Sequence, residues 1–454
     1  MEKKEFYRSA VRLTLPIVVQ NLLSATIAST DVVMLNYVGQ SAVSAVSLAA
    51  NYTSIFFMLV YGIGTGVTML ASQYHGKGDL EAMHMVQGIA LRFSMGAGLL
   101  FALAALLIPG PMMRVFTPDP ELIELGTGYL RVVSASYLCW SVSEVYMASL
   151  RSAERVTVCT VLNIIAFVCN IVLNAVFIFG LLGAPRMGVN GVALGTMLSR
   201  LILLAGCFFL SARSGDIRLK FSYMLRRNRA LFGDFVRMAL PALLNDISWG
   251  VAFSLYSAII AHLSNDAVAA YSFVNIVRQF GTVLCFAVGS AAGIILGNLL
   301  GDGRIEEART GARCLMIMTI IAAACGSVII LILIPVILGF ADLTPTATEY
   351  LRKMMLINTY YIWGSAVNTT LIAGVFRAGG DSRFGMICDT VDMWAYALPL
   401  GFLAAFVLKL PVMWVYFLLC TDEFVKWPWV LRHYMSGRWA KNITRDDLHE
   451  AGTA

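Results

Sequence analysis

Four oxygen-bearing side chains interrupt long apolar stretches in the first half of the sequence. Asp31 stands inside IASTDVVML, Asn170 and Asn174 lie one helical turn apart in NIVLNAVFIFG, and Thr196 ends GVNGVALGT. A carboxylate, two amides and a hydroxyl supply oxygen ligands for a hard cation and hydrogen-bond partners for a proton-binding acid. The four residues therefore predict a site for a coupling ion, Na+ or H+, with no further metal and no cofactor.

Each of these side chains also has a purely structural interpretation. Asp31 could reach water from near a helix end, although Asp is too short to reach far. Asn and Thr in membrane helices commonly hydrogen-bond to a neighbouring helix. For Asp31 we favour ion binding, because a charge at the centre of a membrane helix is unfavourable by about 2.5–3.5 kcal/mol and ionisable residues there are functional by default.

Two more acids, Asp246 in LPALLNDISW and Glu144, lie inside apolar stretches. For each, a role in transport and a local ion pair are the alternatives, with Arg151 or Arg200 as the expected partner of Glu144. A further set of charged residues is predicted to form structural ion pairs near the cytoplasmic side: Asp389, Asp392, Asp422, Glu423, Arg200, Lys426 and Arg278.

The elements that hold these residues are predicted to be membrane helices. Of the 454 residues, 59% are hydrophobic and only 13% are charged, and the mean hydropathy is +0.76; soluble proteins carry about 25% charged residues. A helix of about 20 residues crosses a hydrocarbon core of about 30 Å. The fold class is therefore an all-α membrane protein with twelve membrane-spanning stretches, at 13–36, 44–71, 88–108, 130–150, 157–182, 188–212, 236–261, 268–298, 312–338, 351–376, 386–408 and 411–432.

The distribution of Lys and Arg predicts the orientation in the membrane. One set of loops is rich in both, including 213–237 and 426–445, and the alternate loops are nearly bare. Cytoplasmic loops carry this excess, so both termini are predicted to be cytoplasmic. The basic N-terminus begins an uncleaved first helix rather than a signal peptide, because its apolar run is too long and no A-x-A site follows. In this orientation the four site residues fall in the outer half of the membrane.

Motifs for nucleotide binding, metal binding and covalent catalysis are missing from the sequence. It contains no G-x-x-x-x-G-K-[ST], H-E-x-x-H or G-x-S-x-G, and its nine cysteines include no C-x-x-C pair. GIGTG at 62–66 lies within a membrane stretch, where we expect close helix packing rather than a dinucleotide site. The net charge of +6 suits anionic lipid headgroups and needs no nucleic acid. The sequence predicts neither an enzyme nor an ATP-driven pump.

The second half of the chain repeats the first. RLTLP at 12–16 returns as RMALP at 237–241, and HGKGDLEAM at 75–83 returns as LGDGRIEEA at 300–308, an offset of 225 residues. An even number of helices per copy gives both copies the same orientation, related by an axis along the membrane normal. We therefore predict two pseudo-symmetric six-helix lobes, 1–225 and 226–454. From the LRSAE and FRAGG loops onward the offset is 226, and the aligned pairs are Glu154 with Gly380, Pro185 with Pro411, Thr196 with Asp422, and Arg200 with Lys426.

The two lobes differ at the position of the candidate acid. Asp31 aligns with Tyr256. We therefore expect asymmetric coupling, with Tyr256, Asp246 and Glu144 as secondary transport candidates.

The motifs, taken in order, also resemble a known family. TDVVMLNYVG, HGKGDLEAM, LRSAE, NIVLNAVFIFG, GVNGVALGT, FRAGGDSRFGM and DEFVKW, spread over about residues 10 to 440, are similar to the multidrug and toxic compound extrusion (MATE) family. The resemblance implies secondary antiport, in which inward flow of Na+ or H+ drives export of mostly cationic, amphipathic compounds through two lobes arranged in a V. It also places the cation site of the first lobe at Asp31, Asn170, Asn174 and Thr196.

This chain departs from the family at two acids. The second acid that archaeal-type members carry in helix five is Asn174 here, and the acid that some members carry in helix ten is missing from SAVNTTLIAG. The first departure weakens the case for a pair of carboxylates that share a proton.

Three other functions compete with drug antiport. A lipid or lipid-linked oligosaccharide flippase of the same superfamily would share the architecture, but the sequence offers few arginines for its cavity. A channel would need a continuous polar pore, and a membrane-embedded enzyme would need a nucleophile or metal set that we cannot assemble. We expect a monomer in a plasma membrane, the bacterial inner membrane, that binds small amphipathic cations against Met and aromatic side chains.

Overall fold

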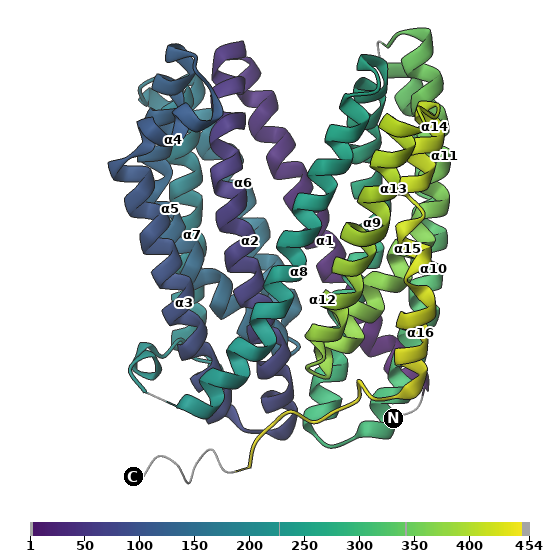
Figure 1. Cartoon of the computed structure of the whole chain (residues 1–454). Coiled ribbons are helices and arrows are strands. Elements are labelled where there is room, and N and C mark those ends of the chain that lie inside the picture. The colour runs from purple at the N-terminus through teal and green to yellow at the C-terminus, as the bar shows by residue number, and fades with distance from the viewer. Residues whose placement is uncertain (1–2, 227, 341–342, 447–454) are drawn as a thin grey trace. The chain divides into compact units, whose positions relative to one another are not determined.

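The computed structural model describes residues 3–226, 228–340 and 343–446, which form helices and no strand (Figure 1). Within the first helix, α1 (Lys3–Asn36), the side chain of Asp31 lies outside the described part. Each of the twelve predicted stretches coincides with a helix or with a run of successive helices, so the all-α prediction is confirmed. Among the described residues, eight helices are long and apolar enough to cross a membrane. The predicted stretches outside these eight, although helical, are 13–36, 130–150, 351–376 and 411–432.

The chain divides into two compact units. The N-terminal unit contains residues 19–239 and 445–454, and the C-terminal unit contains residues 1–18 and 240–444. Two helices with an internal proline, α1 and α8 (Arg229–Ala261), contribute residues to both units. The predicted lobe boundary after residue 225 describes the duplicated sequence and stays a prediction.

The N-terminal unit is a bundle in which α5 packs against α2, α3 and α7, and α6 packs against α7 (purple to blue in Figure 1). Helix ends follow local sequence: the side chain of Asp79 accepts a hydrogen bond from the Ala82 amide at 2.9 Å and so caps α3. The elements are α2 (Gln40–Lys77), α3 (Leu80–Leu107), α4 (Pro109–Phe116), α5 (Pro120–Ser152), α6 (Val156–Phe179), α7 (Val189–Arg213) and two short 3₁₀ helices, Leu181–Gly183 and Phe221–Met224.

The C-terminal unit is built around α9, which packs against α10 and α11. Its later helices contain π-helical stretches, which are rare and frequently mark functional sites. The elements are α9 (Asn265–Gly301), α10 (Ile305–Phe340), α11 (Pro345–Asn368), η3 (Thr369–Phe376, π), α12 (Ser382–Val391), η4 (Asp392–Ala397, π), α13 (Leu398–Phe402), η5 (Leu403–Val407, π), α14 (Val412–Leu419), α15 (Asp422–Val425) and α16 (Trp427–Ser436).

The backbone repeats at two pairs of equivalent turns. Gly78 and Gly303 both adopt a left-handed conformation, with φ of 80° and 78°. Glu154 and Gly380 form a second equivalent pair, with φ of 60° and 75°, and each donates its amide to the carbonyl three residues earlier at 3.0 Å. The sequence repeat is therefore also a repeat of local structure, although one of these four turns uses Glu where glycine is favoured.

The glycines of GIGTG lie where helices pack closely. A methyl group on Gly66 would lie 2.5 Å from Cβ of Ala239 on α8, and one on Gly64 would lie 3.5 Å from Oε1 of Glu144 on α5. The close-packing prediction for this motif is confirmed.

Candidate functional site

Three of the predicted site residues meet between α6 and α7. Asn174 donates through Nδ2 to Oδ1 of Asn170 at 3.3 Å, and Asn170 donates through Nδ2 to Oγ1 of Thr196 at 3.5 Å. Both asparagines are buried. A methyl group on Gly195 would lie 2.1 Å from Oδ1 of Asn174, so this glycine lets the amide lie directly against α7. The fourth predicted residue, Asp31, has its side chain outside the described residues.

Glu144 forms a local ion pair. Its Oε1 lies 2.5 Å from the guanidinium of Arg151, two turns further along α5. Arg200, the alternative partner considered for Glu144, lies with its guanidinium 3.9 Å from the ring centroid of Trp140. Of the two partners predicted for Glu144, the structure selects Arg151.

Asp246 also pairs with an arginine. Its Oδ1 accepts a hydrogen bond from Nη2 of Arg377 at 2.7 Å. Arg151 and Arg377 occupy equivalent positions of the repeat, in LRSAE and FRAGG. The two lobes thus hold equivalent arginines against acids that come from different helices.

A second polar site lies inside the C-terminal unit and is centred on Lys426. The Lys426 ammonium, 1% exposed, lies 2.9 Å from Asp389, 3.0 Å from Glu423 and 3.7 Å from Asp392. The ion pairs predicted for these four residues are confirmed. The prediction is wrong for Arg278, which forms no ion pair within the described residues and instead lies over the ring of Phe253 at 4.6 Å.

Neutral side chains complete this second site. Asn245 donates to Asp389 at 3.0 Å, Tyr361 donates to Glu423 at 3.2 Å, and Asn368 donates to Glu423 at 2.6 Å. Tyr256, a predicted secondary candidate, donates its hydroxyl to Oδ2 of Asp422 at 3.2 Å. Asn245, Tyr361 and Asn368 were not among the predicted residues, although Asn368 lies in SAVNTTLIAG, the stretch noted for its missing acid.

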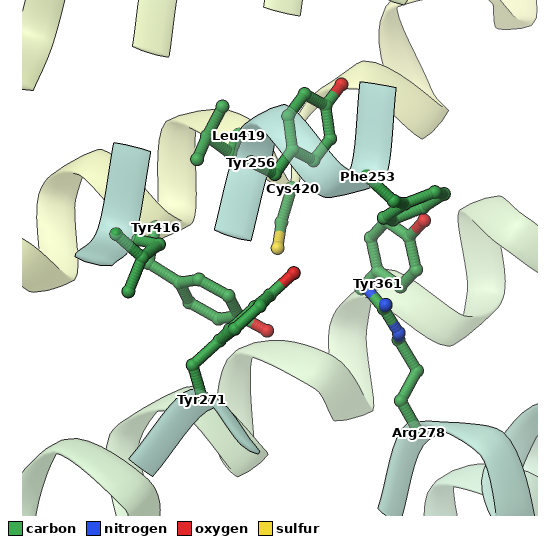
Figure 2. Close-up of a pocket in the computed structure, with 9 residues that line it drawn as sticks. Phe253, Tyr256, Tyr271, Arg278, Tyr361, Tyr416, Leu419 and Cys420 are labelled. Atoms are coloured by element: carbon green, nitrogen blue, oxygen red, sulfur yellow. The ribbon is translucent and has the colours of Figure 1, made fainter. Parts of the chain in front are cut away.

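A small cavity adjoins the second site (Figure 2). Its volume is about 10 Å³, close to the space for a single water molecule. Tyr256 and Tyr361 line it and also donate to Asp422 and Glu423, so the cavity borders the carboxylates. Figure 2 shows the Arg278 guanidinium beside Phe253 and Tyr361 on one side of the cavity.

Known proteins share both the sequence and the fold of this chain. The MatE family matches residues 16–176 and 241–419. The uncharacterized transporter YisQ of Bacillus subtilis is 20% identical over 431 residues, which cover 95% of this chain and 94% of the relative. The probable multidrug resistance protein NorM of Thermotoga maritima is 20% identical over 454 residues, covering 99% and 97%.

Among solved structures, an outward-facing multidrug resistance MATE family transporter superimposes with a TM-score of 0.86 at 17% identity, covering 95% of this chain and 96% of that chain. A MATE structure in the bent conformation gives a TM-score of 0.80 at 18% identity, covering 96% and 98%. The structural likeness shows the shared fold, and the family match extends over most of both halves of the sequence. The chain therefore belongs to the multidrug and toxic compound extrusion (MATE) family.

Proposed function

We propose that this chain is a secondary active antiporter that exports cationic, amphipathic compounds in exchange for Na+ or H+. Relatives named multidrug resistance proteins, NorM of Thermotoga maritima and MdtK of Edwardsiella ictaluri, support export of drugs. The transporter works as a single chain of two lobes in a plasma membrane, the bacterial inner membrane, with both termini in the cytoplasm.

The contact among Asn170, Asn174 and Thr196 is the observation that carries the proposal. Two neighbouring apolar helices bring two amides and a hydroxyl together at a buried position. These groups offer oxygen ligands and hydrogen-bond partners where lipid or aliphatic side chains would otherwise be expected. An ion entering this site would need an anion to balance its charge.

Asp31 is the proposed source of that anion, and the second lobe supports this assignment. Tyr256 and Asp422, the equivalents of Asp31 and Thr196, are hydrogen-bonded at 3.2 Å. In the sequence repeat, Asp31 stands at the position of the donor Tyr256, and Thr196 stands at the position of its acceptor Asp422. The first lobe then has the acid on its first helix and the hydroxyl on its sixth, whereas the second lobe has the reverse.

Coupling follows from a difference in ion affinity between two states. Burial disfavours an unpaired carboxylate, so Asp31 binds Na+ or H+ when the site is closed to water and releases it where water can solvate the anion. A ligand shifts a conformational equilibrium only through its differential affinity for the two states. Inward ion flow can then drive export of a compound that binds to the alternate state.

The test is transport of ethidium in proteoliposomes with Na+ and pH gradients imposed separately. We expect at least one gradient to drive dye movement against its concentration difference, and ionophores that collapse both gradients to stop it. Protein-free liposomes are the control for passive leak. Dye transport that persists unchanged without either gradient would contradict secondary transport.

A further inference from the structure

Asp392 differs from the other acids around Lys426 in its hydrogen bonding. Its side chain is 3% exposed, and neither carboxylate oxygen accepts a hydrogen bond from any described residue. Its nearest cation is the Lys426 ammonium at 3.7 Å, beyond hydrogen-bonding distance. Asp392 is also the first residue of the π-helical stretch η4, a kind of distortion that often marks a functional position.

The other three carboxylates are well supplied with donors. Glu423 accepts hydrogen bonds from Asn368 and Tyr361 and forms an ion pair with Lys426 at 3.0 Å. Asp389 accepts from Asn245 at 3.0 Å and Lys426 at 2.9 Å. Asp422 accepts from the hydroxyl of Tyr256 and, at 2.7 Å, from the backbone amide of Glu423. Hydrogen bonds of this kind stabilise the ionised form of an acid, and Asp392 receives none of them.

The charges of the site do not balance when all of its acids are ionised. Four carboxylates, Asp389, Asp392, Asp422 and Glu423, surround one ammonium, and the described part of the chain brings no second Lys or Arg into an ion pair with them. Buried charges that lack a counter-charge are strongly unfavourable in an apolar interior. The surplus of three negative charges therefore favours protonation, and a proton on the carboxylate with no donor lowers the surplus with the least rearrangement.

We propose that Asp392 is a proton-binding site in the C-terminal unit. The carboxylate takes a proton from water to become a neutral acid, and returns it to water when the cluster opens. This site is separate from the one proposed at Asp31 and does not depend on it. A proton fits better than Na+, because the Lys426 ammonium already lies among three of the carboxylates, where a metal ion would otherwise bind.

The proton on Asp392 would respond to every titratable group of the cluster. An acid that loses its proton next to other anions meets repulsion, whereas Lys426 favours the ionised form. The titratable and charged groups that interact with Asp392 are Asp389 and Cys388 on α12, Asp422 and Glu423 on α15, Lys426 after it and Tyr256 on α8. The titratable and charged groups that line the adjoining cavity, besides Tyr256, are Tyr271 and Arg278 on α9, Tyr361 on α11, Tyr416 on α14 and Cys420 after it.

Infrared spectroscopy of the full chain in lipid nanodiscs tests the proposal directly. At about pH 8 exposed carboxyl groups, with pKa values near 4, are ionised, so a protonated carboxyl band comes from buried neutral acids. We expect such a band in the wild type, shifted in D₂O, and a clear loss of its intensity in Asp392→Asn. Asp246→Asn, which removes an acid paired with Arg377 in the same unit, should leave the band unchanged.

Results with the variants or with Na+ would overturn the proposal. One is a band whose full intensity survives in Asp392→Asn or disappears entirely in Asp31→Asn. The other is a band that Na+ removes at constant pH, because Na+ would then be the ligand of the cluster. None of these readouts requires transport. The proton site at Asp392 can therefore be disproved while drug antiport is supported, and drug antiport can be disproved while the proton site is supported.

Thermal unfolding in the same nanodiscs supplies a second measurement. We expect Asp392→Asn to unfold at or above the wild-type temperature, because no hydrogen bond is lost. Glu423→Gln should unfold at a lower temperature, because its carboxylate accepts two hydrogen bonds and forms an ion pair with Lys426. A decrease in Asp392→Asn as large as that in Glu423→Gln would show an ionised partner of Lys426 instead of a neutral acid.

Discussion

The polar sites of the two lobes occupy equivalent helices but contain different chemistry. In the N-terminal unit the described groups are neutral: Asn170, Asn174 and Thr196. In the C-terminal unit the equivalent of Thr196 is Asp422, within a cluster of four buried carboxylates and Lys426. The turns between helices kept their geometry after duplication, as Gly78 and Gly303 show. The two copies thus share backbone geometry at these turns, whereas their polar side chains differ.

The cations of the two lobes illustrate the same divergence. Arg200 and Lys426 are equivalent in sequence, yet Arg200 lies over Trp140 whereas Lys426 lies among acids. A guanidinium can stack on an aromatic ring, and a compact ammonium can be surrounded by several carboxylates. The choice of cation therefore matches the surroundings in each lobe.

Removing Lys426 should have the largest effect on stability. In Lys426→Met the buried carboxylates of Asp389 and Glu423 lose their counter-charge, and we expect the free energy of unfolding to fall by about 3–5 kcal/mol. The matched change in the other lobe, Arg200→Met, removes the contact with Trp140, which is worth about 0.5–2 kcal/mol. Denaturant unfolding in detergent, followed by tryptophan fluorescence, compares the two. Equal losses of unfolding free energy in Lys426→Met and Arg200→Met would mean that the two cations contribute equally to stability.

Replacing the equivalent arginines Arg151 and Arg377 should have intermediate effects on the free energy of unfolding. Arg377→Met leaves Asp246 without its donor, and we expect a loss of about 1.5–3 kcal/mol, typical of a hydrogen bond to a charged group. Adding Asp246→Asn removes the stranded charge and should restore part of the stability. In the first lobe, Arg151→Met and then Arg151→Met combined with Glu144→Gln provide the same comparison of stability.

Transport by these double variants separates structure from coupling. If both acids serve only their ion pairs, ethidium export by each double variant should remain near the wild-type rate per folded molecule. Loss of gradient-driven export in only the Asp246→Asn/Arg377→Met variant would assign Asp246 a transport role.

The smallest predicted effect concerns the turn that differs between the copies. Glu154 has a φ of 60°, where its equivalent is Gly380. A left-handed conformation is unfavourable for a residue with Cβ by about 1–2 kcal/mol, so Glu154→Gly should raise stability by up to about 1 kcal/mol once the greater freedom of the unfolded chain is included. Gly380→Ala should lower it by a similar amount. Thermal unfolding measures both, and a destabilised Glu154→Gly would show that the Glu side chain makes a contact that outweighs the strain.

Much of the fold follows from the sequence, because apolar length and matching loops are local features. The twelve helical stretches and the equivalent turns required only hydrophobicity, glycine and the offsets of 225 and 226 residues. The contact between Asn170 and Asn174 followed from helical spacing, and Arg151 was one of the two partners expected for Glu144.

Contacts between distant segments were harder to predict. Asp246 and Arg377 are 131 residues apart, and no local pattern joins them. The lack of donors at Asp392 depends on which groups from distant segments reach its carboxylate, which spacing along one helix does not indicate. Arg278 was expected among acids because of its charge, but aromatic rings surround it instead.

Asp31→Asn in proteoliposomes, under the gradient that drives the wild type, tests the coupling proposal most directly. The amide keeps the shape of the side chain but neither titrates nor carries charge. We expect gradient-driven ethidium export to be abolished, while insertion and equilibrium dye binding are retained. Glu144→Gln, which changes an acid paired with Arg151, is the matched control and should still transport. Near wild-type export by Asp31→Asn, with the same ion dependence, would contradict a coupling role for this residue.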